Sequence, residues 1–234
     1  MAFNTGHFMT IKPQRNKADQ GETSKERILA SAESVFAEWG FDGASVRRIS
    51  EEAGVPVALI NYHFGSKAGL YRAIFEKRAP AIMDQRIAGL RLARAEPDLD
   101  RRIDLVVKAL IYPMFSLRGE SPSADFGRMI VREMSDPQSE ARGIFRDMFD
   151  PVAEMLTDAI SKCFPDWTLE EVHWAYHTML GAMMIVMTDN GRMARLSGGR
   201  VSSDNWEEAA RHMCAILVAG LKYRDRDQTR GSED

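Results

Sequence analysis

Apolar residues recur at intervals of three or four positions along most of this 234-residue chain. This spacing gathers them on one face of an α-helix, whereas a half-buried β-strand would need alternation at every second residue, which no segment shows. Three of the predicted helices begin with the sequence of a capping box, at Thr23–Glu26, Thr168–Glu171 and Asp204–Glu207. The sequence therefore predicts an all-α protein.

Glycine and proline mark the ends and interruptions of these helices. Gly40 is the expected left-handed stop of the first helix. Pro80 lies inside the pattern of the fourth helix, which predicts a kink or a break there. A longer helix is predicted from residue 137 to about residue 164, with a kink or a restart at Pro151.

Bulk properties exclude several classes of protein. The net charge is −3, and no apolar run reaches the roughly 18 residues of a membrane-spanning helix. The N-terminus lacks the order of basic, apolar and small residues of a signal peptide, so we expect a cytoplasmic location and no membrane partner. Cys163 and Cys214 are expected to be buried thiols rather than a disulfide or a zinc site.

Motifs of catalysis are missing from the sequence. There is no nucleophile elbow, phosphate-binding loop or dinucleotide fingerprint, so neither an enzyme nor a cofactor is predicted. His173 and His177 stand four residues apart, a spacing that can chelate a metal, but Trp174 occupies the place of a zinc-peptidase glutamate. Packed or interface histidines are favoured, and no metal site is predicted.

The segment SVRRISEEAGVPVALINYHFGSK, residues 45–67, carries the main functional signal. One short helix begins after Ser45 and another runs from about residue 57 to residue 63. Gly54 permits the tight turn between them, and Val55, Ile60 and Phe64 anchor the second helix against the first. This is the spacing of a helix-turn-helix.

From about Thr23 to Phe75 the chain resembles the tetracycline-repressor (TetR) family. That family has a helix ending in Gly-Phe or Gly-Tyr, followed by Ser/Thr-Val-Arg-x-Ile, Ala-Gly-Val, an aromatic-His-Phe and Ser-Lys-x-x-Leu. This chain has all five blocks, in order and at the family's spacing. They are Gly40-Phe41, Ser45-Val46-Arg47-Arg48-Ile49, Ala53-Gly54-Val55, Tyr62-His63-Phe64 and Ser66-Lys67-Ala68-Gly69-Leu70.

The resemblance implies a division of the chain into four parts. Residues 1–22 are expected to be a flexible basic arm, and residues 23–70 an N-terminal three-helix helix-turn-helix domain that binds DNA. Residues 71–222 are expected to form a C-terminal helical domain for effector binding and dimerisation, and residues 223–234 a disordered tail. The basic arm either adds DNA contacts or is simply a disordered tail.

The resemblance also implies DNA contacts residue by residue. Arg47 matches a base- or phosphate-contacting arginine, and a guanidinium can clamp guanine O6 and N7. Tyr62, His63 and Lys67 match positions that grip phosphates, contacts that fix register rather than sequence. The main base-facing positions are Val57, Ala58 and Leu59. All three are apolar, and we hypothesise that they contact thymine methyls while Arg47 and Asn61 supply polar discrimination.

Other roles stay open for several of these residues. Tyr62 can cap the hydrophobic core, and His63 can be a solvated surface histidine. For Asn61 the structural and functional interpretations are balanced. Arg48 is assigned to a charged face with the neighbouring glutamates rather than to DNA, and Pro56 replaces the serine that often caps the third helix in the family.

Two apolar helices near the C-terminus indicate a dimer. In the family the last two long helices pair with those of a second copy in a four-helix bundle, and the resemblance implies the same homodimer; burial of both helices within one subunit is the alternative. A dimer presents two recognition helices to a palindromic operator in double-stranded DNA. The predicted interface residues are Val172, Met179, Met183, Met187, Trp206, Ala210, Met213 and Leu217.

The chain has 14 methionines, whose flexible thioethers suit a pocket for apolar ligands. The residues predicted to line such an effector pocket are Met114, Phe115, Phe126, Met129, Tyr176 and Met183, with Arg128, Arg132 and His177 as polar contacts. Core packing is the alternative at each position, and Arg128 or Arg132 can instead pair with Glu133 or Asp136.

Together these features predict a ligand-responsive transcriptional regulator. Because repressors are usual in this family, the resemblance favours a repressor that a small molecule releases from its operator. The rivals are a small helical enzyme and an architectural DNA-binding protein, and the size of the C-terminal part favours a sensor over the latter. Ligand binding is expected to tilt the fourth helix, with Pro80 as the bend point. This tilt would change the distance between the DNA-binding domains of the two subunits.

Overall fold

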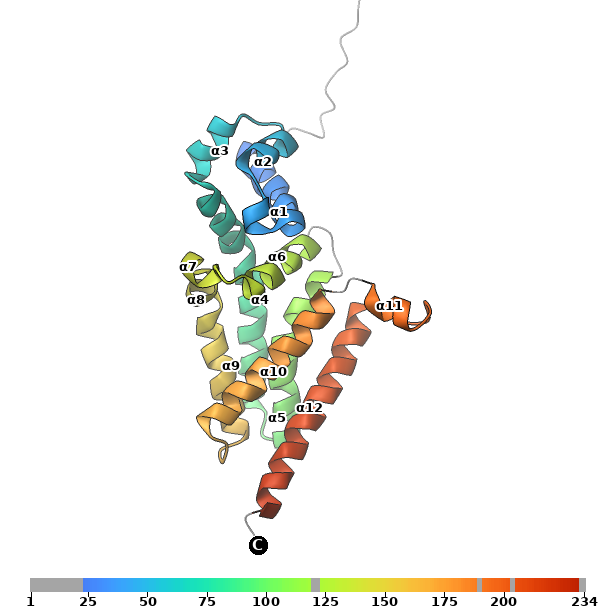
Figure 1. The fold of residues 1–234 in the computed structure, drawn as a ribbon. Helices are drawn as coiled ribbons and strands as arrows, with labels where there is room; N and C mark the ends of the chain where they lie inside the picture. Colours follow the sequence, from blue (N-terminus) through green and yellow to red (C-terminus); the bar gives the residue numbers. More distant parts are fainter. Residues whose placement is uncertain (1–22, 119–122, 189–190, 203–204, 232–234) are drawn as a thin grey trace, which may run out of the picture.

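The computed structural model describes residues 23–118, 123–188, 191–202 and 205–231, and every regular element in these ranges is a helix (Figure 1). The prediction of an all-α fold is confirmed, with an N-terminal helix-turn-helix domain and a C-terminal helical domain. The predicted arm at residues 1–22 and the predicted cap Asp204 lie outside the described residues. Within the described ranges, no helix is both long and apolar enough to cross a membrane.

A three-helix unit at one end of the molecule consists of α1 (Ser24–Gly43), α2 (Val46–Ala53) and α3 (Val57–Phe64). The capping box that starts α1 is present, since Glu26 accepts the Thr23 N–H at 2.8 Å and Thr23 Oγ1 accepts the Glu26 N–H at 3.3 Å. Gly40 has φ 71° and ends the regular part of α1. Phe41 then folds back so that its ring stacks on that of Phe36, 6.2 Å between centroids.

The body of the molecule is a helical bundle that α4 joins to the three-helix unit (Figure 1). α4 packs along α5, and Gly89 allows the close approach because a Cβ there would lie 2.8 Å from Ala109 Cβ. The elements of the body are α4 (Lys67–Ala95), α5 (Leu99–Phe115), the 3-10 helix η2 (Ser116–Arg118), α6 (Ser123–Ser135), α7 (Ser139–Arg142), α8 (Ile144–Met148), α9 (Asp150–Cys163), α10 (Leu169–Met187), α11 (Arg192–Leu196) and α12 (Trp206–Gly231).

Three helix boundaries differ from the sequence predictions. α4 runs through Pro80 without a break, although the proline removes one helical hydrogen bond. Residues 137–164 hold three helices: α9 restarts at Pro151, as predicted, and Gly143 at φ 65° adds a break between α7 and α8 that was not predicted. α12 extends to Gly231, past residue 222 where the C-terminal domain was predicted to end, and residues 232–234 of the predicted tail lie outside the described residues.

One continuous apolar core runs from α1 through α10 and into α12. Cys163 and Cys214 are both free and buried in it, as the sequence predicts. Burial raises the pKa of Cys214 to about 12, so this thiol is protonated and unreactive at neutral pH.

Candidate functional site

The turn between α2 and α3 is held by one glycine and one hydroxyl. Gly54 adopts φ 62° and ψ 37°, the left-handed conformation that the turn requires. Ser50 Oγ donates a hydrogen bond of 2.6 Å to the Val55 carbonyl, which pins α2 to the start of α3. Ile49 and Ile60 are fully buried, so α3 has a fixed orientation on α2. Sequence analysis did not single out Ser50.

The outward face of α3 is open to solvent. Val57 is 38% exposed and Tyr62 82% exposed, and Ala58 and Asn61 are exposed as well. Leu59 and His63 are half-buried. The exposed residues predicted to contact DNA thus share one accessible helix, which begins at Pro56 without a side-chain cap.

Arg47 lies on α2, the helix that precedes α3, and its side chain is exposed to solvent. Its side chain is 85% exposed and its Nε donates to Glu51 Oε1 at 3.0 Å. An exposed pair of this kind contributes at most about 1 kcal/mol, so Arg47 can exchange Glu51 for another anion at little cost. Arg48 is exposed, as are Glu51 and Glu52, and its guanidinium lies over the Trp39 ring, 4.1 Å from the ring centroid.

Lys67 has a structural contact that its sequence position did not reveal. Its Nζ donates to the Phe41 carbonyl at 2.9 Å and the Ala44 carbonyl at 3.2 Å, and lies 4.5 Å from the Phe41 ring centroid. The ammonium group therefore fastens the start of α4 to the end of α1. One of its three N–H donors stays available for a phosphate.

A cavity of about 630 Å³, called here the inner cavity, lies within the C-terminal domain. Four residues predicted to line an effector pocket do line it: Met114, Tyr176, His177 and Met183. Its other apolar lining residues are Ile130, Met134, Phe145, Phe149, Ala153, Leu180, Gly181 and Met184. Helices α4, α5, α6, α8, α9 and α10 all contribute to its wall.

The other predicted pocket residues lie elsewhere. Phe115, Phe126 and Met129 are almost completely buried in the core and do not line the inner cavity, so core packing is their observed role. Arg128 is exposed and pairs with Asp125. Arg132 reaches back to α1, where its Nε donates to the Ala37 carbonyl at 3.0 Å and its Nη2 to the Glu38 carbonyl at 2.9 Å.

Arg86 lines the inner cavity and was missed in the sequence analysis. It is only 4% exposed, and burial lowers the pKa of its guanidinium to about 10, so the group stays charged at neutral pH. The helical spacing could have predicted its burial, because Arg86 follows Met83 by three residues and precedes Leu90 by four, on the core-facing stripe of α4.

A buried polar cluster, called here the junction cluster, lies in the body where α1 packs against it, with the Tyr71 ring 4.8 Å from the Phe36 ring centroid. Glu133 on α6 is 1% exposed and accepts hydrogen bonds from Tyr71 Oη at 3.1 Å, Ser139 Oγ at 3.0 Å and Arg142 Nε at 2.9 Å. Burial, and next the charge of Glu133, raise the pKa of Tyr71, so its hydroxyl stays a donor. The Arg142 guanidinium also lies 4.9 Å from the Phe41 ring centroid.

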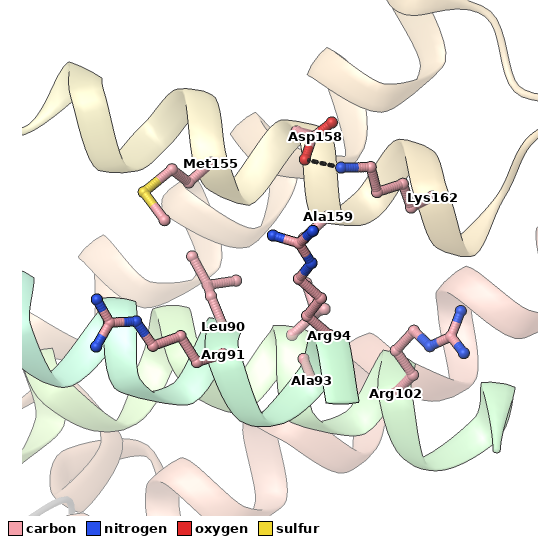
Figure 2. A pocket seen from close by; sticks show the side chains of 10 residues that line it. Leu90, Arg91, Ala93, Arg94, Arg102, Met155, Asp158, Ala159 and Lys162 are labelled. Atoms are coloured by element: carbon pink, nitrogen blue, oxygen red, sulfur yellow. Dashed lines mark hydrogen bonds and ion pairs between the residues drawn. The ribbon is translucent and has the colours of Figure 1, made fainter. Parts of the chain in front are cut away.

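A second cleft of about 310 Å³, called here the basic cleft, lies between α4, α5 and α9 at the end of the body away from α3 (Figure 2). Four basic residues, Arg91, Arg94, Arg102 and Lys162, surround an apolar floor. Lys162 pairs with Asp158 at 2.5 Å, as the dashed line in Figure 2 shows. Arg91, Arg94 and Lys162 are exposed and Arg102 is half-buried, so solvent and salt screen these charges.

The residues predicted for a dimer interface divide into two groups. Val172, Met179, Met183, Met187 and Ala210 are buried in the core of the chain itself. Trp206, Met213 and Leu217 are half-buried. Because the first group is already covered, the accessible surface of α10 and α12 is made of other residues. Among the described residues, no three potential metal ligands come together; His173 and His177 are exposed, with ring centroids 6.3 Å apart.

An exposed helix-turn-helix at one end and a helical body behind it define a DNA-binding transcriptional regulator. The chain belongs to the TetR family. The family described as "Bacterial regulatory proteins, tetR family" matches residues 28–74. A second, described as "Tetracyclin repressor-like, C-terminal domain", matches residues 108–220.

Relatives of known sequence are transcriptional regulators. The chain is 29% identical to the HTH-type transcriptional dual regulator CecR of Shigella flexneri over 158 residues, 65% of this chain and 66% of that protein. It is 39% identical to the HTH-type transcriptional repressor AcnR of Corynebacterium glutamicum over 61 residues, 26% of this chain and 32% of that protein. The matches thus span between about a third and two thirds of these relatives.

Solved structures show the same fold. The fatty acid degradation regulator FadR from Bacillus halodurans aligns with a TM-score of 0.56 and 17% identity, covering 87% of this chain and 98% of that one. FadR from Bacillus subtilis in complex with stearoyl-CoA aligns with a TM-score of 0.51 and 15% identity, covering 83% and 97%. At these identities the likeness concerns the fold alone.

Proposed function

We propose that this chain is a ligand-responsive repressor that binds a palindromic operator as a homodimer and is released by a small molecule. The observation that carries the proposal is the placement of an exposed α3 and Arg47 at one end of α4, with the inner cavity on the same helix at Arg86. Residues 23–70 would bind DNA, and residues 71–222 would bind effector and dimerise. The repressor names of relatives such as AcnR favour repression.

In this proposal α3 enters the major groove. Its exposed apolar residues, Val57 and Ala58, would meet thymine methyls, and Asn61 and Arg47 would contact base edges. Tyr62, His63 and the free donor of Lys67 would contact phosphates at the groove edge.

We expect Arg47→Ala to weaken operator binding by about 1–3 kcal/mol, roughly 10- to 100-fold, because a base-contacting guanidinium contributes that much. Fluorescence anisotropy with a labelled operator duplex measures the loss. Arg91→Ala is the control, since Arg91 lines the basic cleft away from α3 and its removal should leave affinity unchanged. Equal affinities for wild type and Arg47→Ala would exclude Arg47 from the interface.

The proposed dimer interface is the outward face of α10 and α12. Trp174 is 66% exposed, Ile185 72% and Ile216 60%. Ile185 and Ile216 also line an apolar groove of about 1170 Å³ between α10, α11 and α12. Monomeric proteins rarely expose so many large apolar side chains together, and a second copy of the same helices would cover them.

We expect Ile216→Glu to raise the dimer dissociation constant at least about tenfold, because two-fold symmetry buries the new carboxylate twice. Sedimentation equilibrium measures the constant. Leu92→Glu is the matched control, since Leu92 is 63% exposed on α4 and lies outside the groove. A wild-type chain that sediments as a monomer at micromolar concentration would overturn the dimer.

Helix α6 is the proposed link between ligand and DNA. Ile130 and Met134 face the inner cavity, whereas Arg132 and Glu133 on the same helix hold the end of α1 and Tyr71 of α4. A ligand that displaces Ile130 or Met134 would therefore shift the DNA-binding unit through these bonds. This is a population shift between two arrangements of the heads, with Pro80 still the proposed bend point of α4.

A further inference from the structure

Arg86 is the one buried guanidinium for which the described residues provide no counterion. Its Nε has no hydrogen-bond partner, and its Nη2 reaches only the Leu110 carbonyl, at 3.5 Å. Among the residues that the structure describes, Tyr176 is the titratable group that influences the pKa of Arg86, and no carboxylate does so. The buried carboxylates Glu33 and Glu133, by contrast, are paired with Arg78 and Arg142.

An unpaired charge in a protein interior is costly, and an arginine kept there only for packing could be replaced by an uncharged chain of similar length. Arg86 also lines a cavity whose size, about 630 Å³, suits a small molecule. The guanidinium presents parallel N–H donors that match the two oxygens of a carboxylate. A ligand that carries a carboxylate would supply the counterion that the Arg86 guanidinium lacks.

We propose that the effector is a small apolar molecule with a single carboxylate, which pairs with Arg86 inside the inner cavity. This inference rests on the proposed function, whose effector site it specifies. The methionine, isoleucine and phenylalanine side chains of the wall would cover the apolar part of the ligand.

The carboxylates at the edge of the same cavity disfavour a ligand with more than one negatively charged group. Asp150 and Glu154 also line the cavity and are exposed, so two carboxylates lie where the cavity meets solvent. They would repel a ligand that carries further negative charge outside the cavity, such as an acyl-CoA with its phosphates. The structure thus favours the free acid over its CoA ester.

The test compares acids with uncharged analogues of the same shape. Isothermal titration calorimetry of the full chain uses octanoate, decanoate and 4-phenylbutanoate, each against its primary amide, and octanoyl-CoA. We expect at least one acid to bind ten- to a hundredfold more tightly than its amide, because a charged hydrogen bond in a buried site is replaced by a neutral one. Octanoyl-CoA should bind more weakly than octanoate.

Substitutions at Arg86 test whether this residue causes the preference for acids over amides. Arg86→Met should reduce the acid-to-amide ratio to about one while still binding the amide, and Arg86→Lys should keep a preference for acids. Without ligand, Arg86→Met should melt at the same temperature as wild type or higher, because it removes an unpaired buried charge. Arg94→Met changes an arginine of the basic cleft on the same helix and should leave the ratio unchanged (Figure 2).

Four results would overturn the inference. Two concern the acid-to-amide affinity ratio: a value near one for every pair in wild type, or a preference for the acid that survives in Arg86→Met. The others are a loss of this preference in Arg94→Met, which would move the site to the basic cleft, and tighter binding of octanoyl-CoA than of octanoate. DNA binding by the unliganded protein is measured separately. If operator binding is intact but no acid is preferred, the regulator stands and only the effector class fails.

Discussion

Replacing Glu133 with alanine is expected to lower the free energy of unfolding by about 3–5 kcal/mol, because it removes the more buried of the two carboxylates that pair with the nearly buried Arg142. The Arg142 side chain is only 10% exposed and loses the carboxylate that lies 2.8 Å from its Nη2. Asp136 remains at 2.5 Å but is more exposed, and the Tyr71 hydroxyl loses the carboxylate that accepts its hydrogen bond at 3.1 Å. Urea denaturation measures the loss.

The control for Glu133 is an exposed carboxylate nearby. Glu140 pairs with Arg146 at 3.2 Å, and its side chain is 84% exposed. Glu140→Ala should therefore change stability by less than about 0.5 kcal/mol. A loss of less than about 1 kcal/mol in Glu133→Ala would contradict the role of Glu133 as the main partner of the buried Arg142 charge.

The second large effect is expected at Gly69, in the first turn of α4. A Cβ at this position would lie 2.1 Å from the Phe64 carbonyl oxygen, so α3 and α4 must separate to admit it. Overpacking against backbone costs about 1–3 kcal/mol, and Gly69→Ala should reach the upper end of that range. Since Phe64 ends α3, the displacement should also reduce operator affinity at least about tenfold, measured by anisotropy.

Ala68→Ser is the control for Gly69, because Ala68 is the neighbouring residue of the same turn and its side chain is exposed. It should change stability by about 0.5 kcal/mol and leave operator affinity intact. If Gly69→Ala bound the operator as well as wild type does, the orientation of α3 on α4 would not matter for DNA recognition.

The helical fold could be predicted from local sequence because its determinants are local. The capping boxes at Thr23 and Thr168, the stop at Gly40 and the restart at Pro151 all depend on residues within a few positions of each other. The predicted helix from residue 137 to the restart at Pro151 was wrong, because Gly143 in the left-handed conformation ends α7.

The sites were less predictable because their contacts join distant parts of the chain. Glu133 meets Tyr71 across 62 positions, and Arg132 meets the Ala37 carbonyl across 95. Apolar periodicity shows that a methionine is buried but not whether it faces a core, a cavity or a second subunit, which explains why Met129 and Met179 were assigned to surfaces that they do not form. A charged residue on a core-facing stripe, such as Arg86, indicates a ligand site better than a methionine does.

In the proposed function, α3 and Arg47 of a dimer read a palindromic operator. Selection of bound duplexes from a random DNA library, with wild type and Arg47→Ala in parallel, tests it most directly. We predict a consensus of two inverted half-sites about one helical turn or more apart, weakened in the variant. No enrichment at low salt, or an unsymmetrical consensus that Arg47→Ala leaves unchanged, would contradict the claim.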